Sequence, residues 1–241
     1  MSVKTINFSG YKWIVKKRNR PYGPGPNYFS DSDSNVWLDS QGKLHLKIKK
    51  IRNKWYCAEI YLKKPLGYGK YTFCVDNSVE KIDKNVILGL FVYLNLKNEI
   101  DIEFSKWGKN NNANAQFAVQ PFIQKGNLKR FNVDKKISHT INSFLWQKNS
   151  IFFGSFKGNN KKAIASWIYK GRNILKENKV KARMNLWLLN GEKPSDFNEV
   201  EVVISQFSFN KADSKIKIPN IAENIGLSEW TIERIMQNST L

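Results

Sequence analysis

The chain has 241 residues, which fits one large all-β domain, and its hydrophobic content of 41% and aromatic content of 13% exclude wholesale disorder. Its formal net charge is +20, carried mostly by lysines spread along the whole chain. Such a surface is either a solvated lysine coat or an attraction for a polyanion, such as nucleic acid, an anionic membrane or an acidic polysaccharide. No segment is apolar over a length that spans a membrane.

Short β-strands are predicted along most of the chain, separated by Gly, Asn, Asp and Pro. The segment 44–49 shows the alternation of apolar and polar residues that a half-buried antiparallel strand requires. The predicted strands, in chain order, are 44–49, 58–62, 71–75, 86–94, 100–104, 115–120, 150–156, 183–189 and 199–209. Turns at 39–42 and 157–160 fall between them. This spacing favours an antiparallel β-sandwich over residues 1–210 rather than βαβ units.

The two cysteines, Cys57 and Cys74, flank the turn-like stretch 64–69. If that stretch closes a hairpin, the two thiols could face each other across its strands. Two cysteines do not define a disulfide scaffold, so the spacing leaves both a bridge and free thiols open.

The composition changes near the C-terminus. Residues 211–219 are predicted to form a basic linker, and residues 221–237 have a helical pattern. A helix-turn-helix spacing, with a serine placed to cap the second helix, involves Ala222, Gly226, Ile232 and Ser228. A pair of helices lacks the third helix that such a unit needs for a core. We therefore favour a short helical tail that packs on the sandwich, or a partly ordered end.

Three carboxylates alternate in the segment 99–103. In a strand, Glu99, Asp101 and Glu103 project to one face, while Ile100 and Ile102 project to the other. The pattern alone fits a solvated outer face or a cation site built from oxygens.

Strand geometry also allows a catalytic interpretation. The Cα atoms of Glu99 and Glu103 should be about 13 Å apart. Side chains that lean toward each other by about 4 Å close the gap between the carboxyls to about 5 Å. Retaining glycosidases need a separation of about 5–5.5 Å. Carboxyls this close cannot all ionise easily, so at least one pKa should rise and supply the proton of a general acid.

The stretch Glu-Ile-Asp-Ile-Glu-Phe at 99–104 resembles the active-site signature of glycoside hydrolase family 16, a family of concanavalin A-like jelly-roll sandwiches. Other segments fall in the family's order. They are Gly23-Pro24-Gly25-Pro26-Asn27, the strand entry at 39–46, Cys57-Ala58-Glu59 followed by 67–71, Ala115-Gln116-Phe117, Trp146 and Met184-Asn185-Leu186-Trp187. Together they extend the resemblance over roughly residues 10–209.

The resemblance implies roles for the three carboxylates. Glu99 would be the nucleophile, Glu103 the general acid/base, and Asp101 the residue that orients Glu99. No residue is inserted between Asp101 and Glu103, which places the chain nearest the bulge-free branch of lichenases and xyloglucan-active enzymes. No cofactor is implied, although the family allows a structural Ca²⁺.

The substrate-binding candidates come from the same alignment and from strand parity. They are Asn27, Glu59, Tyr93, Lys97, Trp107, Gln116 and Trp187. Lys97 replaces a Trp of lichenases, and its parity predicts a place on the cleft face, where it would pair with Glu99, meet an acidic sugar or reach solvent. Tyr61 stands where lichenases keep an Arg. For Tyr93, Trp107 and Trp187 a place in the core is an alternative. His45 and His139 have no zinc-ligand spacing and are interpreted as structural.

The leading hypothesis is retaining endo-hydrolysis of a β-glucan. Transglycosylation, a non-catalytic carbohydrate- or polyanion-binding sandwich, and nucleic-acid binding through the lysine surface and the tail are the alternatives. We expect a monomer acting on a polysaccharide. The start of the chain has no apolar run of signal-peptide length, which leaves either a cytoplasmic protein or a mature secreted form whose leader was removed.

Overall fold

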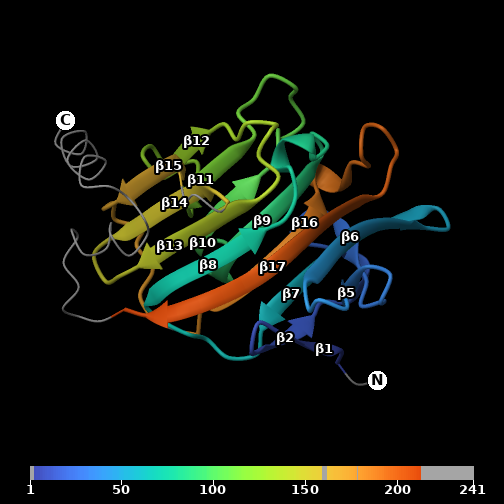
Figure 1. Cartoon of the computed structure of the whole chain (residues 1–241), viewed down its shortest axis with the longest axis horizontal. Helices are drawn as coiled ribbons and strands as arrows, with labels where there is room; N and C mark the ends of the chain where they lie inside the picture. The colour runs from blue at the N-terminus through green and yellow to red at the C-terminus, as the bar shows by residue number, and fades with distance from the viewer. Residues whose placement is uncertain (1–2, 159–161, 178, 213–241) are drawn as a thin grey trace.

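The computed structural model describes residues 3–158, 162–177 and 179–212. The described chain is an almost entirely antiparallel β-sandwich, as the sequence predicts. Figure 1 shows its strands running in broadly similar directions in two overlying layers. The predicted linker and helical tail at 211–241 lie almost wholly outside the described residues.

One layer, sheet A, contains segment 99–104 with its alternating carboxylates. Its strands, in the order in which they lie side by side, are β1 (Thr5–Phe8), β2 (Tyr11–Val15), β7 (Lys54–Leu62), β16 (Lys181–Leu188), β9 (Val86–Asn95), β10 (Asn98–Phe104), β11 (Ala115–Val119) and β12 (Leu128–Phe131).

The second layer is sheet C. Its strands, again in spatial order, are β5 (Val36–Leu38), β6 (Leu44–Ile51), β17 (Val200–Lys211), β8 (Gly69–Val75), β13 (Thr140–Trp146), β14 (Ile151–Lys157) and β15 (Lys162–Tyr169). The β6–β7 hairpin joins the two sheets at one edge, where β3 (Arg18–Tyr22) and β4 (Asn27–Phe29) also pair. Short 3₁₀ turns occur at Val79–Lys81 and Leu189–Gly191.

All nine predicted strands are present, with ends that differ by a few residues at most. The strands that the sequence did not predict are β1 to β5, β12, β13 and β15. Most of these are short or mixed in polarity, and β3 is exposed along its whole length, so the alternation that marks a half-buried strand is missing there. Trp146, expected just ahead of a strand, is the last residue of β13.

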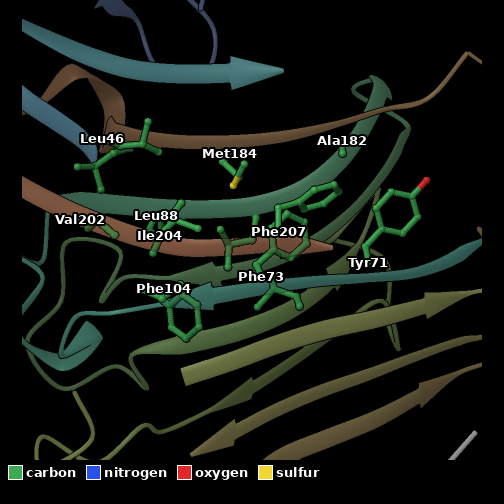
Figure 2. Packing of buried hydrophobic residues seen from close by; sticks show 14 of the residues in the cluster. Leu46, Tyr71, Phe73, Leu88, Phe104, Ala182, Met184, Val202, Ile204 and Phe207 are labelled. Carbon is green, nitrogen blue, oxygen red and sulfur yellow. The ribbon is translucent and has the colours of Figure 1, made fainter. Parts of the chain in front are cut away.

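The core lies between the two sheets. The inward residues Ile100, Ile102 and Phe104 of β10 are fully buried, as their alternation predicts. Figure 2 shows side chains of the two layers interdigitating, among them Leu88 and Met184 from sheet A and Phe73 and Phe207 from sheet C. Aromatic contacts also cross the gap, for example between Phe117 and Phe153, whose ring centroids lie 5.1 Å apart. This packing fixes the backbone of β10, whose other face carries the carboxylates.

The stretch 64–69 does not close a hairpin. It carries the chain from β7 in sheet A to β8 in sheet C, so Cys57 and Cys74 lie in different layers. Both cysteines are free thiols, and burial raises the pKa of Cys57 to about 12. Because the chain crosses between sheets at this stretch, the two cysteines do not face each other across a hairpin and form no disulfide.

None of the helices within the described ranges has the length and apolar character needed to cross a bilayer.

Candidate active site

A cleft of about 840 Å³ lies against the outer face of sheet A, away from the core. Its volume is within the range of ligand-binding sites in enzymes. Residues from β7, β16, β9, β10, β11 and β12 line it, together with the segment 15–24 at one side. The carboxylates of Glu99, Asp101 and Glu103 all line this cleft.

The strands that form the floor are paired in continuous register, so side chains line up in rows across the sheet. One row, from β7 to β12, consists of Glu59, Asn185, Gly89, Glu103, Gln116 and Arg130. The next row consists of Tyr61, Arg183, Phe91, Asp101, Ala118 and Leu128. Lys181, Tyr93 and Glu99 form a third. Adjacent strands are about 4.8 Å apart, so these rows form a continuous surface across the sheet, with polar and apolar side chains side by side.

The carboxylate strand is regular where the chemistry would occur. Its pairing with β9 has a register shift between Asn98 and Glu99, and no shift from Glu99 to Phe104. Its pairing with β11 is regular as well. The three carboxylates therefore keep strict alternation, as the absence of an insertion predicts.

Burial governs the protonation of these carboxyls. Desolvation, with the charge of Glu103 as the second cause, raises the pKa of Glu99 to about 8. Desolvation raises the pKa of Glu103 to about 7, although a hydrogen bond from Gln116 and the charge of Arg130 act in the opposite direction. Asp101 is only 3% exposed, and burial together with the charges of its two neighbours raises its pKa well above the usual value. The group consequently holds extra protons near neutral pH.

Two amide side chains hold the outer carboxyl oxygens. Gln116 Nε2 donates to Glu103 Oε2 at 2.6 Å, and Gln120 Nε2 donates to Asp101 Oδ2 at 3.3 Å. Asp101 is also hydrogen-bonded to Glu99, an interaction that lowers the pKa of Glu99 and raises that of Asp101. This hydrogen bond therefore favours Asp101 as the donor and Glu99 as the acceptor whenever the pair holds a single proton.

The floor keeps unused hydrogen-bonding groups. Gln116 Oε1, Arg183 Nε and Asn185 Oδ1 are buried and have no hydrogen-bond partner within the described structure, and all three residues line the cleft. Buried polar atoms are rarely left without a partner, which makes these three the atoms that a polar ligand would satisfy.

Gly89 makes room for one of these groups. It lies opposite both Glu103 and Asn185, and a Cβ atom at this position would be 2.5 Å from Asn185 Oδ1. Because Gly89 has no side chain, the amide of Asn185 can lean across β9 toward the carboxylates.

Glu59 is the centre of a buried ion-pair group. Its Oε2 lies 2.6 Å from Lys16 Nζ, and its Oε1 lies 2.7 Å from Arg183 Nη1. Glu59 is 1% exposed and Lys16 7% exposed. The residue predicted to contact sugar hydroxyls therefore lines the cleft with both oxygens already paired to cations.

The predicted aromatic residues also line the cleft. Tyr93 and Trp187 are half-buried on the cleft face of β9 and β16, and neither belongs wholly to the core. Trp107 follows β10 with a positive φ of 45°, and the guanidinium of Arg130 lies 4.4 Å above its ring. Tyr22, Leu96 and Phe122 add exposed apolar surface to the cleft wall.

Two residues that were predicted to contact the substrate do not line the cleft. Lys97 is exposed in the β9–β10 turn and does not line the cleft, because strand parity holds only within β10, which begins at Asn98. Asn27 is buried, and its Nδ2 donates to the carbonyls of Pro24 and Leu188 at 2.9 and 2.8 Å. It fixes the loop at the end of the cleft and is not part of the cleft lining.

The histidines are held by acidic partners. His45 lies 3.2 Å from Asp39 and 2.8 Å from Glu201, and His139 lies 2.5 Å from Asp76. Within the described ranges, no group of three or more His, Cys, Asp or Glu is placed to hold a metal ion. A structural Ca²⁺ stays a prediction.

Several functional candidates were not identified from the sequence. They are Lys16, Gly89, Gln120, Arg130, Arg183 and Asn185. For Arg183 and Asn185 a signal exists, since both share strand parity with the predicted Trp187. Arg183 lies directly opposite Tyr61, so the neighbouring strand supplies a guanidinium beside the position where the arginine of lichenases is missing. For Lys16, which follows β2, only the fold brings it to Glu59.

Comparison with known proteins gives likenesses in structure alone. No family model matches the chain, and no curated protein matches its sequence. A β-glucanase of Bacillus licheniformis superimposes with a TM-score of 0.64 at 19% identity, covering 88% of this chain and 99% of the glucanase. A pseudo β-1,3-glucanase of Mycobacterium tuberculosis gives 0.62 at 16% identity, with coverage of 83% and 91%. The Crh5 transglycosylase gives 0.58 at 11% identity, with coverage of 88% and 85%. The chain thus has the sandwich fold of these glucanases and glycosidase-like proteins.

Proposed function

We propose that this glucanase-like sandwich is a retaining, endo-acting β-glycoside hydrolase of the family 16 type that cleaves a polysaccharide of the β-glucan class. The observation that carries the proposal is the unbroken alternation of Glu99, Asp101 and Glu103 on the floor of the cleft. Their backbone is fixed from below by three fully buried side chains of the same strand. A regular strand also supports the lichenase and xyloglucan-active branch.

Glu103 has the properties of a general acid. Burial raises its pKa to about 7, so near neutral pH a substantial fraction of it carries the proton that a leaving glycosidic oxygen needs. Gln116 and Arg130 favour the ionised form, which the same residue must adopt when it activates water in the second step. Opposing influences that leave the pKa near neutrality suit both halves of the cycle.

Glu99 is the proposed nucleophile. The proton on Asp101, directed at Glu99, stabilises the carboxylate form that attacks the anomeric carbon. In the first step the Glu99 oxygen forms a bond to this carbon while the glycosidic bond breaks and Glu103 gives its proton to the leaving oxygen. In the second step water loses a proton to Glu103, its oxygen bonds to the anomeric carbon, and Glu99 leaves as a carboxylate. Two inversions give net retention.

The rest of the floor would bind the sugar chain. Asn185 and Gln116 offer unpaired polar atoms on either side of the carboxylates, and Trp107, Trp187 and Phe122 offer ring surface. A cleft that continues across several strands fits an internal segment of a polymer better than a chain end, which supports endo-action.

Turnover on mixed-linkage, β-1,3 and xyloglucan substrates, with Glu99→Gln as the control, tests the proposal. Release of shorter oligosaccharides that disappears in the variant supports it. No release from any substrate, or equal release by the variant, would overturn it.

Transglycosylation is a second candidate because the Crh5 transglycosylase shares the fold. It uses the same covalent intermediate, with a sugar hydroxyl in place of water. Product lengths measured with and without an added oligosaccharide acceptor separate the two activities, since only a transglycosylase makes products longer than its donor.

A further inference from the structure

The cleft has a strongly cationic side. Lys16, Arg18, Lys181 and Arg183 line it where β2, β3, β7 and β16 meet, and Glu59 is the carboxylate among them. A second carboxylate nearby, Asp31, is matched by its own partner Lys17 at 3.0 Å. Of these four cations, Lys16 and Arg183 form ion pairs with Glu59, and the charge of Arg183 also acts on Glu99.

The ion-pair pattern leaves positive charge in excess. Glu59 lies within 2.7 Å of two cations, so its single negative charge cannot balance both. The Nε atom of Arg183 is buried and has no hydrogen-bond partner within the described structure. Arg18 and Lys181 have no carboxylate within ion-pair distance in the described part of the chain. Uncompensated charge in a partly buried site is costly, and an anionic ligand would offset that cost.

The aromatic rings here are covered by the same cations. The guanidinium of Arg183 lies 5.0 Å from the centre of the Tyr61 ring and 4.7 Å from that of Tyr93. Lys181 Nζ lies 5.7 Å from the Tyr61 ring, and Arg18 lies 4.9 Å from the ring of Tyr22. Each of these rings has a cation close to it, so this wall presents charge to the cleft beside its ring surface.

The position of these cationic side chains restricts the charge pattern of a ligand that could bind in the cleft. Arg183 is paired with Phe91, which is paired with Asp101, so the cations lie two strands, or about 10 Å, from the carboxylate strand. A ligand that crosses the cleft meets carboxyls at the centre and cations at one side. A continuous phosphodiester backbone would meet repulsion at the centre, whereas a sugar chain with an acidic substituent on one unit would not.

We propose that Arg183, with Lys181 and Arg18, forms a subsite for an anionic substituent, a carboxylate or a sulfate ester, on a sugar unit away from the bond that is cleaved. This inference rests on the proposed function, because it assigns the substrate class of the same cleft. Arg183 carries the recognition, since a guanidinium can present two parallel donors to either group.

The test measures binding to the full-length Glu99→Gln variant, which separates recognition from turnover. The probes are a β-glucan oligosaccharide, the same oligosaccharide with its primary alcohols oxidised to carboxylates, a sulfated form, and a single-stranded oligodeoxynucleotide. At an ionic strength of about 0.15 M, one of the two anionic oligosaccharides is expected to bind about tenfold or more tightly than the neutral one. Whichever of the carboxylated and sulfated oligosaccharides binds more tightly identifies the substituent.

Variants locate the effect. Adding Arg183→Gln should remove most of the preference for the anionic oligosaccharide while changing neutral binding much less. Arg172→Gln, an exposed arginine outside the cleft lining, should keep the preference. If Arg183→Gln unfolds the chain, Lys181→Gln serves instead. Equal binding of neutral and anionic probes, equal losses for both in the variants, or equally tight binding of the oligodeoxynucleotide would overturn the inference.

The two proposals fail in different ways. Turnover of neutral β-glucan without any anionic preference contradicts the anionic subsite and leaves the hydrolase intact. Selective binding of an anionic oligosaccharide without turnover on neutral, carboxylated or sulfated glucan contradicts the hydrolase and leaves the subsite intact.

Discussion

Gln116 donates a hydrogen bond of 2.6 Å from its Nε2 atom to Oε2 of Glu103, directly across the β10–β11 pairing. A donor at this position stabilises the ionised form of the carboxyl and so holds the pKa of Glu103 down against the effect of burial. The proposed general acid therefore depends on a neighbour that can be changed without touching the carboxyl itself.

Gln116→Leu should shift the pH dependence of activity. Without the donor the pKa of Glu103 rises, so the acid stays protonated to higher pH and the alkaline limb of kcat moves upward by about half a unit to one unit. The measurement is kcat against pH, with Gln147→Leu outside the cleft as the matched control. An alkaline limb that stays in place or moves downward would contradict the assignment of Glu103 as the acid.

Glu99→Gln should change how stability depends on pH. The pKa of Glu99 in the folded chain is raised to about 8 from its ordinary value of 4.5. A raised carboxyl pKa gives stability that is present at low pH and is lost as the pH rises through the folded value. The variant has no carboxyl at this position and does not lose stability in this way. The melting temperature of the variant minus that of the unsubstituted chain should therefore increase between about pH 5 and pH 8.

Thermal unfolding across that pH range is the measurement. Glu192→Gln on the exposed surface controls for the substitution itself. A difference in melting temperature that stays constant with pH would show that Glu99 is not a protonated, desolvated carboxyl.

Glu59→Gln should destabilise the fold. It leaves two cations, Lys16 and Arg183, without their buried partner, and breaking such a pair lowers the free energy of unfolding by about 3 kcal/mol. Asp31→Asn breaks the more exposed pair with Lys17 and should change it by less than about 1 kcal/mol. Denaturant unfolding of both variants checks the contrast, and similar values for the two would be inconsistent with the buried group.

Gly89→Ala should lower activity without unfolding the chain. The added methyl group would lie 2.5 Å from Asn185 Oδ1 and must displace the amide from its place over Gly89, the residue paired with Glu103. Because displacements of about 1 Å in an active site cost up to about a hundredfold in rate, we expect kcat/KM to fall by tenfold or more. In an Asn185→Ala background, Gly89→Ala should lower kcat/KM little further. If the two substitutions lower kcat/KM independently, Gly89→Ala does not act through the Asn185 amide.

The sequence predicts the alternation of β10 well and its surroundings less well, and the difference has physical causes. Alternation within β10 is a local property, so the cleft and core faces of Glu99 to Phe104 follow directly from it. Extending the same parity to Lys97 fails, because β10 begins at Asn98 and Lys97 lies in the turn before it.

Contacts between distant segments were the least predictable part. Cys57 and Cys74 flank a turn-like sequence, yet the chain uses it to change sheets. The Lys16–Glu59–Arg183 group joins three segments that only the strand order brings together. The identity of Arg183 as a cleft residue could have been found from its parity with Trp187, whereas its pairing with Glu59 could not.

The anomeric configuration of the first product, followed by NMR during hydrolysis of the best polysaccharide substrate, tests the central claim most directly. Retention through a Glu99 intermediate predicts that the β-anomer appears first and that Glu99→Gln forms no product. Initial formation of the α-anomer, or product formation that survives Glu99→Gln, would contradict the account.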